Sequence, residues 1–173
     1  MMSVFTNGFP KSGNHALVKA CELLGVPCKV NHRGTQEGLP EGTTHHLLIV
    51  RDPRDVVISM LRFNRQPVTP GMFIARLRCF EFAHLVEEMA LFEPWLKTAF
   101  VVRYEDLIRD STEMERIAAH LGTPYFEGTW EELPGLTYTW NDVHSDYRKI
   151  WNPHLEETWA KDGGKELLAR WGY

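Results

Sequence analysis

The stretch SVFTNGFPKSGNHALVKACELLG, residues 3–25, has the pattern of a strand, a glycine-containing loop and a helix in direct succession. The apolar run of residues 3–6 predicts the strand, and residues 14–24 predict a helix that Gly25 ends. The loop between them reads Gly8-Phe9-Pro10-Lys11-Ser12-Gly13-Asn14-His15. Backbone N–H groups at a helix start, together with a lysine, favour an anion. The loop therefore predicts a phosphate site, and the alternative is a plain turn with a solvated lysine.

The position of the lysine separates this loop from the nucleoside-triphosphatase loop. That loop has lysine directly after its second glycine, followed by serine or threonine. Here Lys11 precedes Gly13 by two residues. Any phosphate held here is therefore bound by a different arrangement of residues.

The rest of the chain continues the alternation of strand and helix. Further extended pieces are expected at 28–30, 46–50 and 99–102, with a polar loop over 31–44. Helices are expected from Asp52-Pro53 through residue 61, over 72–92, from Ser111-Thr112 to residue 121 with Glu115 completing a capping box, and over 163–171. Residues 123–153 look rich in loops. The order predicts an α/β fold, a three-layer sandwich with a central parallel β-sheet flanked by helices, in one domain over residues 1–173.

Composition narrows the class of protein. The chain has 173 residues, a formal net charge of -4, 43% hydrophobic and 24% charged residues, which are ordinary values for a globular domain. The net acidity argues against a general nucleic-acid binder. The three cysteines are an odd number with no Cys-x-x-Cys spacing, which favours reduced thiols and a cytoplasmic location. The chain has no run of 18 apolar residues, so no contact with a membrane is expected.

A second anion site is predicted where the strand 46–50 ends. Arg51 stands at its carboxyl end, where open α/β sheets bind ligands, and Ser59 lies about two turns into the following helix. An arginine fork and a hydroxyl can grip one phosphate. The alternative pairs Arg51 with Asp55 and leaves Ser59 as an ordinary polar residue of the helix.

Four blocks in order resemble the sulfotransferases that use 3'-phosphoadenosine 5'-phosphosulfate. They are Pro10-Lys11-Ser12-Gly13, then Arg51-Asp52-Pro53-Arg54-Asp55-Val56 with Ser59, then Arg103-Tyr104-Glu105-Asp106-Leu107, and a tail from Trp151-Asn152-Pro153-His154-Leu155 to Tyr173. The resemblance implies a P-loop-like sulfotransferase topology. It also implies transfer of a sulfuryl group from this donor to an acceptor hydroxyl, which leaves adenosine 3',5'-bisphosphate and needs no metal.

The resemblance also implies roles for single residues. Lys11, Ser12 and Gly13 would hold the 5'-phosphosulfate, with Lys11 at the bridging oxygen. Arg51 and Ser59 would hold the 3'-phosphate. Tyr104 would lie beside the adenine, and its alternative is a buried core tyrosine.

Two departures from the family pattern concern the nucleotide site. Asn14-His15-Ala16 stands where the family commonly has Thr-Thr-Trp, so Asn14 and His15 are expected as nucleotide contacts without the stacking tryptophan. Arg148-Lys149 lacks the glycine of the family's last loop, and Arg148 is expected at the 3'-phosphate. Thr139-Trp140 is expected near the adenine.

The reaction needs a base for the acceptor hydroxyl, and histidine suits neutral pH. In the family the base follows the second strand in a Lys-x-His-like element, and Lys29-Val30-Asn31-His32 occupies that place, which makes His32 the first candidate. His15, inside the phosphate loop, is the competitor. Only about 40 residues separate Lys11 from Arg51, which predicts a trimmed acceptor side and an extended acceptor such as a carbohydrate.

Two other functions stay open from the residues alone. A module of the same fold could bind the nucleotide without turnover, and a small P-loop kinase would use ATP and Mg²⁺. The sequence leaves the identity of the acceptor and the oligomeric state undetermined.

Overall fold

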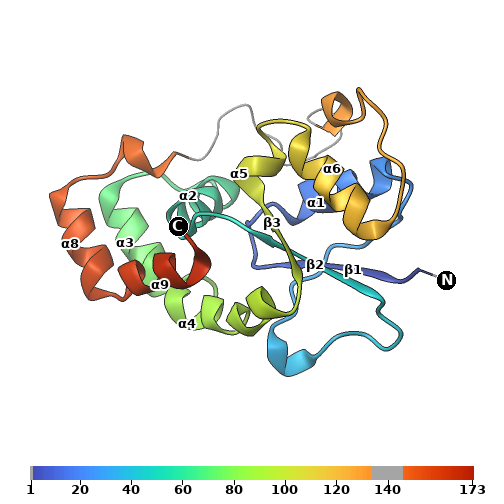
Figure 1. Cartoon of the computed structure of the whole chain (residues 1–173). Helices are drawn as coiled ribbons and strands as arrows, with labels where there is room; N and C mark the ends of the chain where they lie inside the picture. Colours follow the sequence, from blue (N-terminus) through green and yellow to red (C-terminus); the bar gives the residue numbers. More distant parts are fainter. Residues whose placement is uncertain (1, 134–145) are drawn as a thin grey trace. The chain divides into compact units, whose positions relative to one another are not determined.

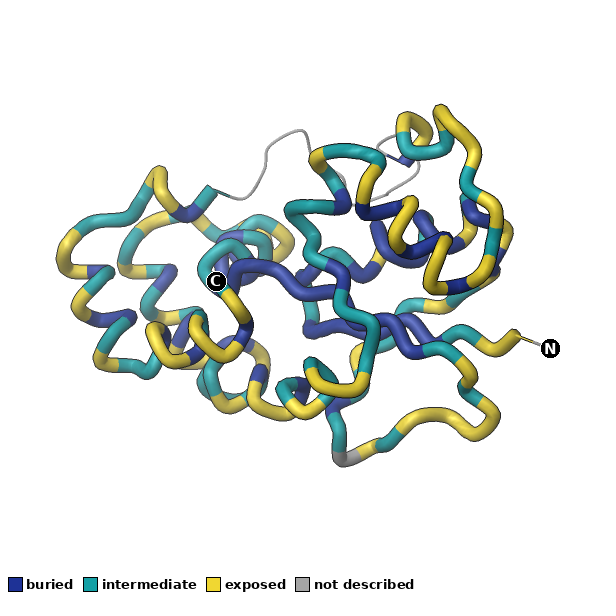
Figure 2. The backbone as a smooth tube through the Cα atoms, viewed as in Figure 1, coloured by how far each residue is buried: buried dark blue, intermediate teal, exposed yellow. Residues whose placement is uncertain are grey.

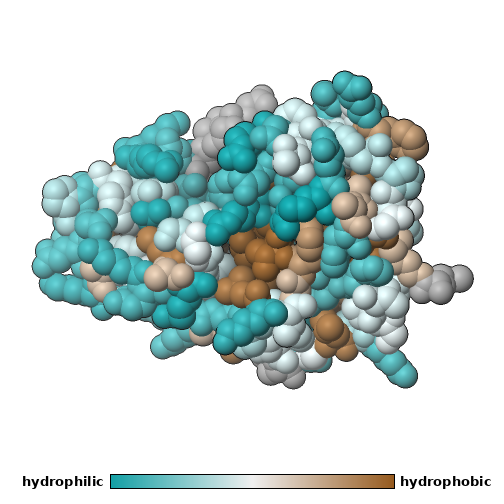
Figure 3. Space-filling view, viewed as in Figure 1, coloured by the Kyte–Doolittle hydropathy of each residue, from teal (hydrophilic) through white to brown (hydrophobic). Residues whose placement is uncertain are grey.

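The computed structural model of the chain describes residues 2–133 and 146–173. These residues divide into two compact units, one within Met1–Arg51 and Pro94–Asp142 and one within Asp52–Glu93 and Val143–Tyr173. Short 3₁₀ turns cover Thr35–Glu37, Glu93–Lys97, Trp130–Glu132 and Tyr147–Lys149. On the face shown in Figure 3, hydrophilic residues predominate and hydrophobic residues are also visible.

A three-stranded parallel sheet forms the centre of the first unit (Figure 1). Its order is β1 (Val4–Gly8), β2 (His45–Val50) and β3 (Phe100–Arg103), with β2 in the middle. Helices α1 (Asn14–Leu23), α5 (Tyr104–Leu107) and α6 (Thr112–Leu121) belong to the same unit. The prediction of a central parallel sheet flanked by helices is therefore confirmed.

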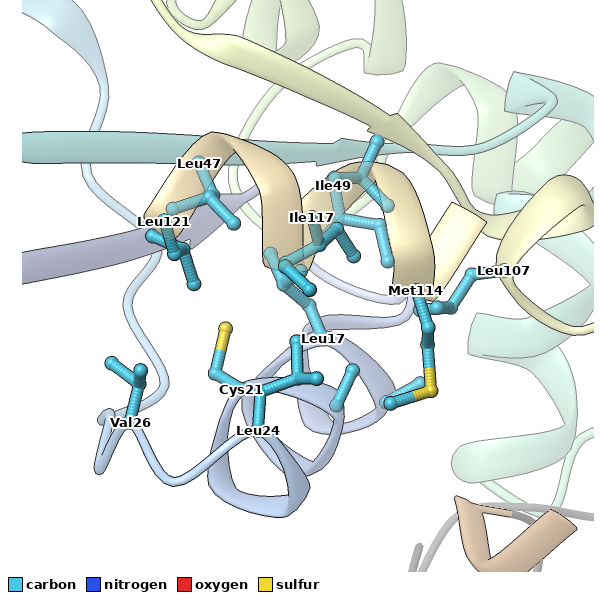
Figure 4. Close-up of a cluster of buried hydrophobic side chains, with 14 of the residues drawn as sticks. Leu17, Cys21, Leu24, Val26, Leu47, Ile49, Leu107, Met114, Ile117 and Leu121 are labelled. Carbon is cyan, nitrogen blue, oxygen red and sulfur yellow. The ribbon is translucent and has the colours of Figure 1, made fainter. Parts of the chain in front are cut away.

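One face of the sheet packs on α1 and α6 (Figure 4). Strand β2 is buried along nearly all its length, as the dark tube of Figure 2 shows. Leu47 and Ile49 of β2 meet Leu17 of α1 and Ile117 of α6, and all four side chains are fully buried. Burying each such side chain contributes about 1.5–3 kcal/mol. This core holds the carboxyl ends of the strands, where the predicted site lies.

Residues 28–30 do not form a strand, although an extended piece was expected there. This segment runs beside β1, and hydrogen bonds from side chains join the two in place of the backbone hydrogen bonds of a β-sheet. The Thr6 hydroxyl donates to the Lys29 carbonyl over 2.6 Å, and the Asn31 amide donates to the Thr6 carbonyl over 3.1 Å. Polar side chains on an edge strand have satisfied the backbone groups that a ladder would use.

His46 of β2 is a buried histidine in apolar surroundings. Its ring lies 4.9 Å from the Trp95 ring and 5.4 Å from the Phe5 ring, and within the described residues neither ring nitrogen has a hydrogen-bond partner. Burial lowers the pKa of His46 to about 4. The unfolded chain, with a histidine pKa of about 6.5, therefore takes up this proton first as the pH falls.

We accordingly expect the free energy of unfolding to drop between pH 6.5 and 4, by up to about 3 kcal/mol from His46. Urea unfolding of the wild type and of His46→Phe at pH 7 and pH 4.5 measures this contribution. The phenylalanine variant should lose less stability on acidification. Equal losses in the two proteins would show that His46 does not set this pH dependence.

The second unit is helical. It contains α2 (Pro53–Phe63), α3 (Pro70–Arg78), α4 (Leu85–Ala90), α8 (Pro153–Lys161) and α9 (Gly164–Trp171). Asp52 caps α2 by accepting the Arg54 N–H, as predicted for Asp52-Pro53. The sequence interpretation missed α8, although Asn152 at its N-cap and Pro153 at its first position are helix-start signals.

The prediction of one helix over 72–92 is wrong, because a non-helical segment separates α3 from α4. One carboxylate oxygen of Glu88 accepts the backbone N–H groups of three successive residues in the break, Glu81, Phe82 and Ala83, at 2.7–3.1 Å. These N–H groups point to a side chain and not to carbonyls four residues earlier. The helical ladder therefore cannot pass through the break.

The capping box predicted at the start of α6 is also wrong. The side chain of Ser111 makes no capping bond, and its hydroxyl donates to Glu115 instead. Asp110 takes the capping role, because its carboxylate accepts the Thr112 N–H at 3.0 Å. A carboxylate at a helix start also suits the helix dipole.

Candidate functional site

The loop between β1 and α1 folds into a tight turn around one carbonyl. The Phe9 carbonyl accepts the Ser12 N–H at 3.1 Å and the Asn14 side-chain amide at 2.9 Å. Lys11 and Gly13 both have positive φ, 68° and 103°. Asn14 is buried and braces the loop, so its role as a nucleotide contact stays a prediction.

The two glycines of the loop are required by close approach. A Cβ on Gly13 would lie 2.3 Å from the Tyr104 ring, and one on Gly8 would lie 2.5 Å from the Asn14 side chain and 2.7 Å from that of Ile49. No side chain fits at such distances unless backbone or buried atoms move. The loop is thus pressed against β2 and the start of α5.

Ser12 carries the clearest sign of a ligand. Its side chain is fully buried at the start of α1, and its hydroxyl oxygen has no hydrogen-bond partner among the residues that the structure describes. An unsatisfied buried hydroxyl costs about 1–3 kcal/mol. Such a cost at a helix N-terminus indicates a place for an anion.

Arg51 brings a second incompletely satisfied group to the same place. Its side chain is 6% exposed, and one terminal nitrogen donates to the Lys11 carbonyl at 3.4 Å. The guanidinium lies 4.3 Å from the centre of the Tyr104 ring. Its Nε is buried and lacks a partner within residues 2–133 and 146–173. The first unit thus brings together Arg51, Tyr104 and the loop that the sequence predicted.

His32 lies at the carboxyl end of β1 with an exposed side chain. Its Nδ1 is 2.9 Å from the Gly8 carbonyl oxygen. Because a carbonyl only accepts, Nδ1 carries the hydrogen in the neutral ring and Nε2 keeps the lone pair. This is the tautomer that a base needs, with Nε2 as the accepting atom.

His15 is the other candidate base, and it stands in the second position of α1. Partial burial lowers the pKa of His15, and the nearby charges of His32, Lys11 and Lys19 lower it further. The ring is therefore neutral at physiological pH. The two histidines lie close enough to influence each other, so both belong to the site region.

The remaining predicted residues stand in the second unit. Ser59 is half-buried on α2, and the Arg148 side chain is 72% exposed and lies 3.5 Å from Asp146. The alternative to a phosphate site at Arg51 was an ion pair between Arg51 and Asp55. The Asp55 carboxylate accepts the Tyr147 N–H at 2.9 Å. Whether Ser59 and Arg148 join Arg51 stays a prediction. Thr139-Trp140 lies outside the described residues.

An open groove of about 390 Å³ runs along the edge of β1. It is beside the segment that carries His32, and its lining is mainly apolar: Val4, Phe5, Pro27, Cys28, Lys29, Asn31 and Pro40. Its size is within the range of small-molecule sites. Sequence reasoning missed this groove, because residues from three separate segments form it.

The described residues contain no group of three or more histidine, cysteine or acidic side chains that could hold a metal ion. Within the same residues, no helix is both long enough and apolar enough to cross a membrane.

A family profile and a solved structure show what the chain is similar to. A family profile described as a sulfotransferase domain matches residues 30–139, which include His32, Arg51 and Tyr104 but begin after the Gly8–His15 loop. The fold is similar to the crystal structure of mouse sulfotransferase SULT7A1 complexed with PAP. The TM-score is 0.71 at 15% sequence identity, over 98% of this chain and 86% of that chain. No curated protein sequence matches significantly.

Proposed function

The chain belongs to the sulfotransferase family, and we propose that it takes the sulfuryl group from 3'-phosphoadenosine 5'-phosphosulfate and passes it to an acceptor hydroxyl. Adenosine 3',5'-bisphosphate is the second product. The similar mouse enzyme was crystallised with PAP, which supports this donor. The match over 98% of the chain supports a single sulfotransferase domain over residues 1–173.

One observation carries the proposal. Ser12 Oγ and Arg51 Nε are buried polar atoms without partners in the described part of the chain, and both belong to the cluster around the Lys11 loop. Buried polar groups in proteins are nearly always hydrogen-bonded. A phosphosulfate or phosphate would supply oxygens for both atoms. The residues present therefore fit an anionic nucleotide.

The roles follow from charge and position. Sulfuryl transfer resembles phosphoryl transfer, in which catalysis consists of positioning and stabilisation of charge. His32 Nε2 takes the proton from the acceptor hydroxyl as its oxygen forms the new bond to sulfur. Lys11 stabilises the negative charge on the phosphate oxygen whose bond to sulfur breaks. Ser12, Gly13, Asn14, His15, Arg51, Ser59, Tyr104 and Arg148 are the proposed nucleotide contacts.

We propose that the acceptor approaches His32 along the groove at the edge of β1. The groove is open and lies next to the segment of the base, which suits an extended acceptor such as a carbohydrate better than an enclosed small molecule. No metal is needed for these steps, because the transferred proton and the leaving charge each have a residue to receive them.

Thermal-shift titrations separate this proposal from its alternatives. Adenosine 3',5'-bisphosphate should raise the unfolding temperature, whereas ATP with Mg²⁺ or ADP should raise it less. Stabilisation by ATP with Mg²⁺ alone would favour a kinase. Binding of the bisphosphate without turnover of the sulfate donor across a panel of acceptors would favour a nucleotide-binding module.

Ser12→Ala should stabilise the protein and weaken its ligand at the same time. Loss of the unsatisfied hydroxyl is expected to raise the free energy of unfolding by about 1 kcal/mol. A hydrogen bond to a charged group contributes about 1.5–3 kcal/mol, so affinity for the bisphosphate should fall about 10- to 100-fold. Urea unfolding and calorimetric titration measure the two effects.

Ser3→Ala is the matched control, because it makes the same substitution nine residues earlier at an exposed serine. It should change neither quantity. An affinity of Ser12→Ala within twofold of the wild type would remove Ser12 from the site.

A further inference from the structure

The segment that carries His32 is attached to β1 by an unusual set of contacts. Three successive residues of the strand, Thr6, Asn7 and Gly8, each accept from or donate to this segment. Asn7 is fully buried, and an amide inside an apolar strand carries a cost unless its bonds are satisfied. The bonds that satisfy Asn7 therefore identify its function.

Both bonds of Asn7 go to one residue, Arg33. The Asn7 side-chain nitrogen donates to the Arg33 carbonyl at 2.8 Å, and the Arg33 N–H donates to the Asn7 side-chain oxygen at 2.9 Å. A planar amide that donates and accepts in this way replaces a residue of a neighbouring strand. Trp95 Nε1 adds a third bond by donating to the same carbonyl at 3.1 Å.

Arg33 directly follows His32, and Asn31 on the other side donates to the Thr6 carbonyl. The backbone is thus fixed on both sides of His32. With this backbone placement the ring reaches the Gly8 carbonyl, and the 2.9 Å contact there sets the tautomer. A base misplaced by about 1 Å can lose about 100-fold in rate.

We propose that Asn7 is a positioning residue for His32, acting through the Arg33 backbone with Trp95 as a second support. Asn7 orients the imidazole and sets its tautomer without touching substrate. The inference rests on the proposed function, because it takes His32 as the base.

Asn7→Leu tests the proposal, since leucine has a similar volume and makes neither bond. The kcat should fall about 10- to 100-fold, whereas the Kd for adenosine 3',5'-bisphosphate should stay within about twofold. In a His32→Ala background the same substitution should lower kcat by less than about twofold. Equal losses in both backgrounds would overturn the proposal, because they would show a general structural effect.

The failure of the proposed base has a different signature. If His32→Ala by itself leaves kcat unchanged, the base assignment is wrong whatever Asn7 does. Thr6→Val is a matched control on the same strand, because Thr6 bonds to Lys29, three residues before the base. It should lower kcat by less than about threefold, and a loss as large as that of Asn7→Leu would contradict a specific role for Asn7.

Nitrogen-15 NMR of the His32 ring gives a readout that does not depend on turnover. At a pH where the ring is neutral, the wild type should show the tautomer with hydrogen on Nδ1. Asn7→Leu should shift the ring toward the Nε2–H tautomer that a solvated imidazole prefers. An unchanged tautomer would overturn the proposal.

If Asn7→Leu does not fold, Trp95→Phe replaces it in both measurements. This variant removes one of the two donors to the Arg33 carbonyl and keeps an aromatic ring beside His46. We expect Trp95→Phe to lower kcat a few-fold when His32 is present. In the His32→Ala background the same substitution should not lower kcat further. No loss of kcat, or a loss that persists in that background, would count against the proposal.

Discussion

Replacing Lys11 with alanine is expected to lower kcat about 100- to 1,000-fold, the cost of removing one group that stabilises developing charge. The expectation rests on the loop geometry. Lys11 lies in the turn that packs closely against β2 because Gly8 and Gly13 have no side chains. The Lys11 carbonyl accepts a hydrogen bond from Arg51. Alanine leaves that carbonyl in place and removes only the ammonium group. Single-turnover rates with the labelled sulfate donor measure the effect.

Lys19→Ala is the matched control for Lys11→Ala, because it removes a charge of the same sign from α1, at a partly exposed position where Lys19 pairs with Glu22. Lys19→Ala should keep kcat within about twofold. Full activity of Lys11→Ala, with the bisphosphate still bound, would rule out Lys11 as the group that stabilises the leaving oxygen. An equal loss in both variants would point to the general charge of the region.

Replacing His32 with alanine is expected to lower kcat about 100- to 10,000-fold, the range that general base catalysis contributes. Nucleotide affinity should stay nearly unchanged, because the His32 ring bonds to the Gly8 carbonyl and its Nε2 serves the acceptor. The measurements are kcat with a fixed acceptor and the Kd of adenosine 3',5'-bisphosphate. A parallel collapse of both would contradict the base role.

His15→Ala decides between the two histidines. Burial and neighbouring positive charges lower the pKa of His15, which favours the neutral ring that a base needs, so its protonation state alone does not exclude it. The Gly8 carbonyl orients the His32 ring, which favours His32. A large loss of kcat in His15→Ala with little change in His32→Ala would exchange the two roles.

Local pattern was a good guide to elements that depend on residues a few positions apart, and a poor one where distant side chains decide the structure. The strand–loop–helix unit of residues 3–25 and the cap at Asp52-Pro53 occur as predicted, because each depends on residues a few positions apart. The break between α3 and α4 was missed. Apolar spacing over 72–92 continues through it, and only the folded chain brings Glu88 back onto the three N–H groups.

The edge of the sheet shows the same limit. The sequence predicted a short extended piece at residues 28–30, between the helix that Gly25 ends and the polar loop that begins at residue 31. Thr6, Asn7 and Asn31 then take the backbone partners that a ladder would have used. Polar residues in an edge strand were the available signal, but their partners lie 23–26 residues away in the chain.

By itself, the sequence determined the loop between β1 and α1, the parallel α/β class and the resemblance to sulfotransferases, because glycine, proline and hydrophobic periodicity act over short distances. The tertiary structure alone decided which buried atoms lack a partner among the described residues, Ser12 Oγ and Arg51 Nε, and which amide supports the segment that carries His32. Those facts depend on segments brought together across 26 and 40 residues of chain. Hydrogen bonding at such separations is set by packing, which no local pattern encodes.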